Sequence, residues 1–198
     1  MGMELFAGFA RIAAEGAAAE GPEEALHAVT RALPALLGDP SAALRPQAFR
    51  EDPPPRIGAA CAAFMRTADG LHHMIVAPVN FAPEQHHELV DIGLGHPGEV
   101  ARTHQPMLLR DTALHASFVK ILQSFRAGSS IFAPLMWKGE YLGVLICANA
   151  ARNTFGEADL IAHRGFAALA ASLWVAQGGR EWMAAQDLSG LPRRSAGS

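Results

Sequence analysis

The chain has 198 residues, of which half are hydrophobic and 18% are charged, and its formal net charge is −3 at pH 7. This composition excludes a disordered chain, and the negative charge argues against a phosphate-binding surface and therefore against nucleic acid as a partner. The length is sufficient for one domain with a full core, so we expect a single globular domain with some additional helix.

The sequence shows no feature of a membrane or exported protein. No apolar run approaches the roughly 20 residues needed to cross a bilayer. The first ten residues lack the basic segment of a secretory signal, and Phe6 occupies a position where N-myristoylation requires serine or threonine. We therefore expect a cytoplasmic protein. Cys61 and Cys147 both fall in apolar runs, which favours buried thiols over a disulfide.

Two helices are predicted at the N-terminus. Residues 4–19 place large apolar side chains on one helical face, and Pro22 with the two glutamates after it begins a second helix. We assign residues 1–37 to these helices and expect them to pack on the domain or against a second subunit. The proline-rich segment 38–55 is expected to be a loop, because too little chain precedes it for a domain boundary.

A first strand pair follows this loop. Residues 57–67 and 71–79 are apolar runs of strand length, and they are joined through Asp69 and Gly70, a dipeptide typical of β-hairpins. Several alanines in the first run leave room for another element, such as a helix, to pack closely over it.

Shorter elements are predicted in the middle of the chain. Pro83 is expected to open a short helical stretch over residues 84–92, residues 95–104 to form another short helix, and residues 106–111 to form a strand. The segment 112–128 is expected to be a helical connecting element. Its apolar residues at helical spacing are Phe118, Ile121, Leu122 and Phe125.

The second strand pair spans residues 129–149, where two apolar runs are joined by Lys138 and Gly139. Both runs carry large apolar residues on both of their alternating faces, so we expect strands that are covered on both sides. Pro134 cannot donate to a strand ladder, which predicts a bulge or a locally unpaired position there.

A long helix is predicted after this hairpin, because apolar residues recur at helical spacing from Leu160 to Leu173. Thr154 and Glu157 have the spacing of a capping box, and Glu157 and Asp159 lie at the positive end of the helix dipole. The cap accounts for these polar residues without a ligand.

These last elements carry a family resemblance. Over residues 130–160 the order Ser-x-Phe-x-Pro-Leu, a glycine turn, Leu-Gly-Val-Leu, Asn and Phe-Gly-Glu-Ala-Asp-Leu resembles the second half of a GAF domain, and residues 95–112 are similar to its Gly-x-x-Gly-x-Val-Ala segment. The resemblance implies an α+β fold with an antiparallel-type sheet of about six strands, helices on both faces and a ligand pocket over one face. We assign residues 38–176 to this domain and residues 177–198 to a helical extension with a disordered tail, which begins near residue 191.

The resemblance also implies a function, namely a non-enzymatic sensory domain that binds a small effector under the segment 112–128. Its signal would pass through the terminal helices to a second subunit of a homodimer or to a partner signalling protein. A helix start near Gly95 and two adjacent hydroxyl groups would hold a small anion or an amino-acid-like metabolite. The alternative, that these residues only shape turns, is equally compatible with the sequence. The residues we expect at the ligand are His96, His115, Phe118, Leu122, Phe125, Ser129, Ser130, Phe132 and Cys147.

Two other chemistries of the family remain as alternatives, and the cofactor is therefore left open. Asp111 and His115 have the spacing of the acidic residue and proximal histidine in haem-carrying GAF sensors, although Ala116 replaces the proline that usually follows. Free methionine sulfoxide reductases of this family use two thiols in pocket loops, whereas Cys61 and Cys147 are predicted in strands.

The nine histidines do not form a known metal motif. His72 and His73 are adjacent on a predicted strand and therefore point to opposite faces. His86 and His87 lack the i, i+4 spacing of a zinc-binding helix, and no Cys-x-x-Cys pair accompanies them, so we expect no structural zinc site.

Overall fold

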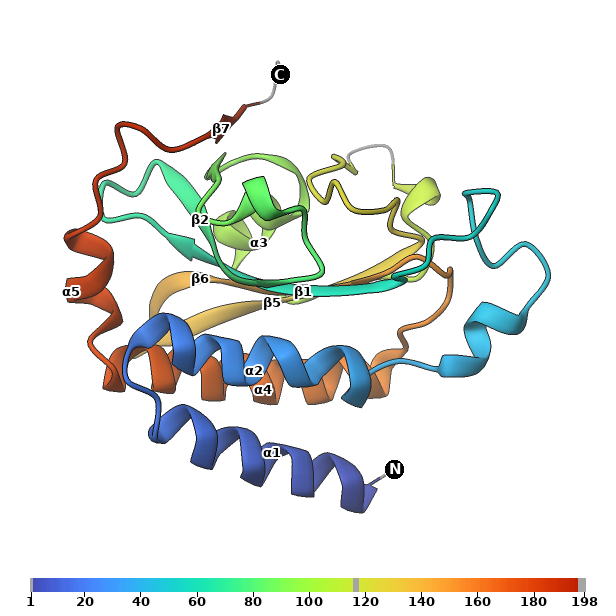
Figure 1. Cartoon of the computed structure of the whole chain (residues 1–198), viewed down its shortest axis with the longest axis horizontal. Coiled ribbons are helices and arrows are strands. Elements are labelled where there is room, and N and C mark those ends of the chain that lie inside the picture. Colours follow the sequence, from blue (N-terminus) through green and yellow to red (C-terminus); the bar gives the residue numbers. More distant parts are fainter. Residues whose placement is uncertain (1, 116–117, 196–198) are drawn as a thin grey trace.

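The fold is built on one sheet that lies between two layers of helices and loops (Figure 1). The computed structural model describes residues 2–115 and 118–195. Within these residues the sheet has seven strands in the order β4-β5-β6-β1-β2-β3-β7. The strands are β1 (Ala59–Arg66), β2 (His72–Val79), β3 (Leu89–Asp91), β4 (Met107–Leu109), β5 (Ser129–Trp137), β6 (Glu140–Asn149) and β7 (Arg193–Arg194).

The helices cover both faces of this sheet. The α-helices are α1 (Gly2–Ala17), α2 (Pro22–Leu36), α3 (Gly95–Thr103), α4 (Glu157–Ala176) and α5 (Gly179–Ala184), and the 3-10 turns are η1 (Pro40–Leu44), η2 (Pro83–Gln85) and η3 (Thr112–Leu114). Figure 1 shows α2 and α4 side by side against one face, with α1 on their outer side and α3 over the opposite face. The predicted α+β class with helices on both faces is confirmed. The sheet has one strand more than expected, because β7 pairs with β3, in parallel.

Strand alternation divides the core into two parts. On the side of α2 and α4, the residues that pack together include Cys61, Met65, Ile131, Leu145 and Cys147. On the side of α3, the corresponding residues include Phe64, Phe132, Val144 and Ile146. Strands β5 and β6 are therefore covered on both faces, as their sequence predicts.

The central hairpin joins β5 to β6 through Lys138 and Gly139. Both residues have positive φ angles, +48° and +83°, which match the twist of a two-residue hairpin turn. The predicted bulge at Pro134 is displaced, because Pro134 pairs in register with Val144 and the register shifts one residue later, after Leu135. Strand β4 pairs only with residues 130–132, so it does not need an N–H group from Pro134.

Helix α4 begins at Glu157, but its cap differs from the prediction. The Asp159 carboxylate accepts hydrogen bonds from the backbone N–H groups of Gly156 and Gly38, both at 2.8 Å. Thr154 instead donates its hydroxyl to the carbonyl of Ala151 at 2.9 Å. The predicted capping box of Thr154 and Glu157 is therefore wrong, and Asp159 both caps α4 and fastens the loop that follows α2.

The segment after β2 completes the sheet edge instead of forming a helix. The N–H group of His87 donates to the carbonyl of Ile75 at 2.9 Å, and the N–H group of Ile75 donates to the carbonyl of Glu88 at 3.0 Å. These bonds lead into β3. Pro83 does begin a short helical turn, η2, but the helix predicted over residues 84–92 is wrong beyond Gln85. The predicted hairpin at Asp69 and Gly70, the helix over 95–104 and the strand over 106–111 are confirmed as β1–β2, α3 and β4.

The C-terminal residues return to the same sheet edge. The N–H group of Leu89 donates to the carbonyl of Pro192 at 2.8 Å, and Arg194 forms an ion pair with Glu88 at 3.0 Å. The expected disordered tail is therefore wrong for residues 191–195, while residues 196–198 lie outside the described part of the chain. None of the helices in the described residues is long and apolar enough to cross a membrane.

Candidate functional site

An apolar pocket lies between the sheet and the segment of residues 118–127, which we call the lid. About 430 Å³ of space there is free of protein atoms, and because this figure includes space open to solvent, the pocket is a partly open hollow and not an enclosed cavity. Its walls come from β1, β5, β6, the start of α3 and the lid. The lining residues are Phe64, Phe81, His96, Pro97, Phe118, Val119, Ile121, Leu122, Ala127, Ser130, Phe132, Ile146 and Ala148. Within this lining only His96 and Ser130 carry polar side chains.

His96 is held at the inner end of the pocket by the start of α3. Gly95 has a φ angle of +58°, and a side chain at Gly98 would collide with the backbone of Gly93, so this tight turn requires glycine. The His96 ring stacks on Phe132 with 5.8 Å between ring centroids. His96 is 4% exposed, and its Nδ1 has no hydrogen-bond partner among the described residues.

The charge state of His96 follows from this position. Burial, followed by the neighbouring imidazole of His115, holds the pKa of His96 below its ordinary value. The ring is therefore neutral near pH 7. A neutral imidazole offers one donor and one acceptor, so His96 can hydrogen-bond a polar group of a ligand in an otherwise apolar pocket.

The lid forms no helix. Among the described residues of the longer segment 112–128, η3 is the single helical element, so the prediction of a helical connecting element is wrong for most of this segment. Side chains from other elements bind the backbone groups of the lid. The Gln85 side chain donates to the carbonyl of Ile121 at 2.8 Å and accepts from the N–H group of Gln123 at 2.9 Å. The Thr112 hydroxyl donates to the carbonyl of Ala127. These bonds replace those of a helix and leave the apolar side chains free to line the pocket.

The structure brings five of the predicted ligand residues to the pocket. They are His96, Phe118, Leu122, Ser130 and Phe132. Ser130 and Phe132 are two residues apart on β5 and therefore project from the same face, toward α3.

Four predicted residues lie elsewhere. Ser129 and Cys147 project from the opposite face of the sheet, where the Ser129 hydroxyl donates to the carbonyl of Ala151 at 2.8 Å. Phe125 packs in an adjoining apolar cluster with Leu122. His115 contacts the edge of the His96 ring, with 5.6 Å between centroids, but it lines a separate polar groove.

The two cysteines form a buried pair on the helix side of the sheet. Cys61 and Cys147 are direct cross-strand neighbours with 3.3 Å between their Sγ atoms, and both are free thiols, as predicted. Burial raises the pKa of the Cys61 thiol well above its ordinary value. Burial also raises the pKa of Cys147, but its hydrogen bond with Cys61 and the neighbouring His163 outweigh burial and lower the pKa to about 6. The pair is separated from the pocket by the sheet.

The residues around His115 do not fit the haem alternative. The Asp111 carboxylate caps η3 and forms ion pairs with Arg50 and Arg152, so it is fully occupied. His115 ends η3, and its ring lines the groove beside Lys120 and not the apolar pocket. The spacing of Asp111 and His115 is thus explained by the two ends of a 3-10 turn.

Several residues of this site were not identified from the sequence. Phe64 and Phe81 form an edge-to-face pair at the pocket wall, with 6.3 Å between ring centroids, but they lie on separate elements far upstream of the lid. Gln85 lies in a turn that was predicted to be a helix. The phase of β1 is a usable signal for Phe64, because Ala62 and Phe64 alternate with the buried Cys61 and Ala63.

The GAF domain model matches residues 21–174 of this chain, a range that includes α2 and ends within α4. The solved GAF domain of a Coxiella burnetii phosphoenolpyruvate-protein phosphotransferase aligns with a TM-score of 0.72 at 20% identity, covering 91% of this chain and 98% of that one. The corresponding Acinetobacter domain gives a TM-score of 0.70 at 14% identity, covering 93% and 97%.

An enzyme has the same fold. The free methionine-R-sulfoxide reductase of Neisseria meningitidis aligns with a TM-score of 0.63 at 13% identity, covering 85% of this chain and 86% of that one. At these identities the likeness concerns the fold alone. A comparison with curated protein sequences gives no match.

Proposed function

Because this chain belongs to the GAF domain family, we propose that it is a non-enzymatic sensory domain that binds one small organic molecule beneath the lid and transmits its presence to the terminal helices. The observation that carries this proposal is the pocket itself. Its lining combines four phenylalanine rings with two polar side chains, those of His96 and Ser130. Ligand sites of proteins are typically apolar hollows with a few placed polar groups.

The chemistry of the pocket favours a particular class of ligand. Four phenylalanine rings and a neutral imidazole suit a flat, mostly apolar molecule with one hydrogen-bonding group. Within the lining no Lys or Arg balances a negative charge, so a small inorganic anion is a poorer fit than the sequence suggested. Ligand binding would favour a conformation in which the lid covers the pocket. The signal would then be a shift in the populations of two conformations that differ in their affinity for the ligand.

The positions of the thiols support a non-enzymatic role. Cys61 and Cys147 are buried beneath α4, on the face of the sheet opposite the pocket, and a ligand beneath the lid does not reach them. A cytoplasmic location belongs to the same proposal, because buried cysteines in the strands of a sheet are typical of reduced thiols.

A serine pair on β5 provides the test of the pocket. We expect Ser130→Ala to weaken the binding of a small uncharged aromatic probe, such as indole, by about 0.5 to 1.5 kcal/mol, because one hydrogen bond is lost. Ser129→Ala is the matched control, since Ser129 projects to the opposite face and bonds Ala151. Ligand-observed NMR titration measures both. Equal affinities in the two variants would place the probe outside this pocket.

We also propose that α1 forms a homodimer contact. Gly8, Ile12 and Gly16 are the buried residues of α1, while Phe6 is 78% exposed and Met3 is 86% exposed on its remaining surface. Phe9, by contrast, packs against Phe166 of the same chain with 5.6 Å between the centroids of the tilted rings. The exposed apolar side chains are therefore available to a second copy.

This contact predicts the behaviour of one surface variant. We expect Phe6→Glu to convert a dimer into a monomer, because a dimer would bury this carboxylate without a partner charge. Leu44→Glu is the control, since Leu44 is 86% exposed on η1, far from α1 in the sequence. Light scattering of the two variants and the wild type measures the mass. A monomeric wild type, or a dimeric Phe6→Glu variant, would contradict the contact.

A further inference from the structure

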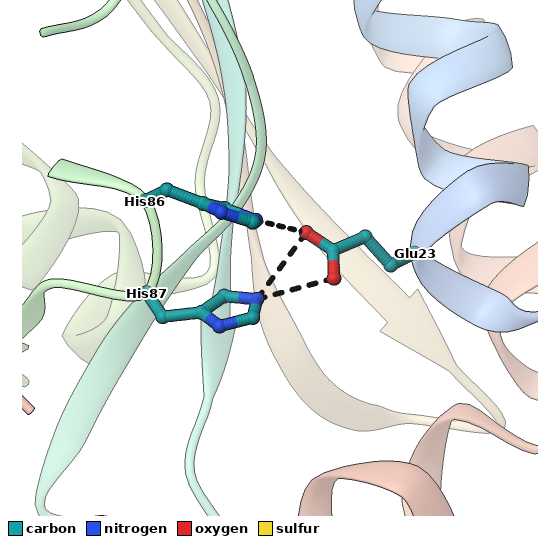
Figure 2. A group of neighbouring side chains, drawn as sticks. All are labelled: Glu23, His86 and His87. Atoms are coloured by element: carbon teal, nitrogen blue, oxygen red, sulfur yellow. Dashed lines mark hydrogen bonds and ion pairs between the residues drawn. The ribbon is translucent and has the colours of Figure 1, made fainter. Parts of the chain in front are cut away.

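Three metal-ligating side chains converge between α2 and the turn that follows η2 (Figure 2). Glu23 lies in the first turn of α2, and His86 and His87 follow η2. The Glu23 carboxylate is 2.5 Å from Nε2 of His86 and 3.1 Å from Nε2 of His87. One ligand atom from each residue lies within 4.8 Å of the others. Both imidazoles thus direct the same nitrogen toward one carboxylate.

The backbone fixes this arrangement. Adjacent residues of an extended chain point in opposite directions, but His87 has a φ angle of +63°, and the two rings lie together with 4.0 Å between their centroids. The N–H group of His87 donates to Ile75 of β2, and its ring packs against Trp182 at 5.7 Å. The ligands are therefore held by the sheet, by α2 and by α5 together.

A third imidazole lies near this cluster. One helical turn further along α2, His27 interacts electrostatically with Glu23 and His86, and its buried Nδ1 has no hydrogen-bond partner among the described residues.

We propose that Glu23, His86 and His87 bind one divalent transition-metal ion of the Zn²⁺ class. Imidazole nitrogen and carboxylate oxygen are the ligands that such ions prefer, and two imidazoles with one carboxylate leave a fourth position for water. Zinc-to-ligand bonds of about 2.0 to 2.2 Å place tetrahedral ligand atoms roughly 3.3 Å apart. The observed carboxylate-to-imidazole separations of 2.5 and 3.1 Å are shorter than this value, so the cluster must open to admit the ion.

The position of this site gives the ion a structural role. Gln85, which holds the lid through Ile121 and Gln123, immediately precedes His86 in the chain. An ion bound by both histidines and by Glu23 would fix this turn to the start of α2. The metal site would therefore connect a helix of one layer to the lid of the opposite layer, independently of what the pocket binds.

The experiment uses the full chain without an affinity tag, stripped of metal with a chelator and titrated with zinc chloride. Calorimetry and native mass spectrometry are expected to show one tightly bound Zn²⁺ per chain. Glu23→Gln preserves the shape of the side chain, and His86→Ala changes a side chain that is 47% exposed, so both variants are expected to fold. Loss of a contact that only supports a metal ligand costs roughly 10- to 100-fold in metal affinity, and we expect each variant, which loses a ligand itself, to lose more Zn²⁺ affinity than this.

His72, which lies between two carboxylates outside the proposed site, provides the matched control. His72 lies 4.0 Å from Asp69 and 3.7 Å from Asp91, but its two nitrogens face separate carboxylates and do not converge on one point. We expect His72→Gln to bind Zn²⁺ like the wild type. No bound ion in the wild type, unchanged affinity in Glu23→Gln and His86→Ala, or an equal loss in His72→Gln would each overturn the proposal.

Discussion

Replacing Gln85 by alanine is expected to lower the free energy of unfolding by roughly 2 to 4 kcal/mol and to loosen the lid. Gln85 is fully buried, and its amide makes hydrogen bonds to Glu88, to the carbonyl of Ile121 and to the N–H group of Gln123. Removal of the side chain leaves these groups without their partner, and each unsatisfied buried group costs about 1 to 3 kcal/mol. Urea unfolding measures the loss.

Hydrogen exchange locates the effect. Peptides from the lid are expected to exchange faster in Gln85→Ala, whereas peptides from α4 are not. Gln123→Ala is the control, because it removes an exposed side chain but keeps the backbone N–H group that Gln85 binds. We expect this control to change stability by less than about 0.5 kcal/mol. If lid exchange is the same in Gln85→Ala and in the wild type, apolar contacts alone hold the lid.

The lid also shows where prediction from the sequence ends. The two hairpins and helices α3 and α4 were predictable, because their turn residues and apolar spacing are local signals. The lid has a helical apolar spacing as well, but its backbone is bound by Gln85, which lies 36 residues before Ile121. Residues 84–92 were misassigned for a similar reason, since their backbone groups bond to β2. Contacts between distant segments override local propensity in both places.

The candidate site was predictable only in part. Strand parity places Ser130 and Phe132 on one face and Ser129 on the other, so alternation alone could have removed Ser129. The cluster of Glu23 with His86 and His87 could not be derived, because 63 residues separate Glu23 from His86 and the positive φ angle of His87 has no signature in the sequence. The resemblance to one family supplied the fold, but not the ligands of its sites.

A steep loss of stability in acid is the second large effect that we expect, and it originates at His73. This residue of β2 is fully buried, and its Nε2 lies 2.7 Å from the Tyr141 hydroxyl. Burial, assisted by the charge of Arg66, lowers the pKa of His73 from 6.5 to about 3. The folded protein therefore holds a neutral imidazole at a pH where the unfolded chain protonates it.

The direction of the effect follows from proton binding. Between about pH 6.5 and pH 3 the unfolded state binds more protons at His73 than the folded state, so the free energy of unfolding falls as the pH falls. One pKa unit corresponds to about 1.4 kcal/mol, so the loss from this residue reaches roughly 2 to 3 kcal/mol at pH 4.5. Carboxyl groups that contribute to acid unfolding are unchanged in a variant at this position, so the difference between variant and wild type isolates His73.

His73→Gln keeps a neutral partner for the Tyr141 hydroxyl and cannot be protonated. Between pH 7 and pH 4.5 we expect the free energy of unfolding of this variant, measured in urea, to fall by roughly 2 to 3 kcal/mol less than that of the wild type. Parallel curves for His73→Gln and the wild type would mean that the folded protein takes up the proton at His73, and that this end of the α3-side core opens to water.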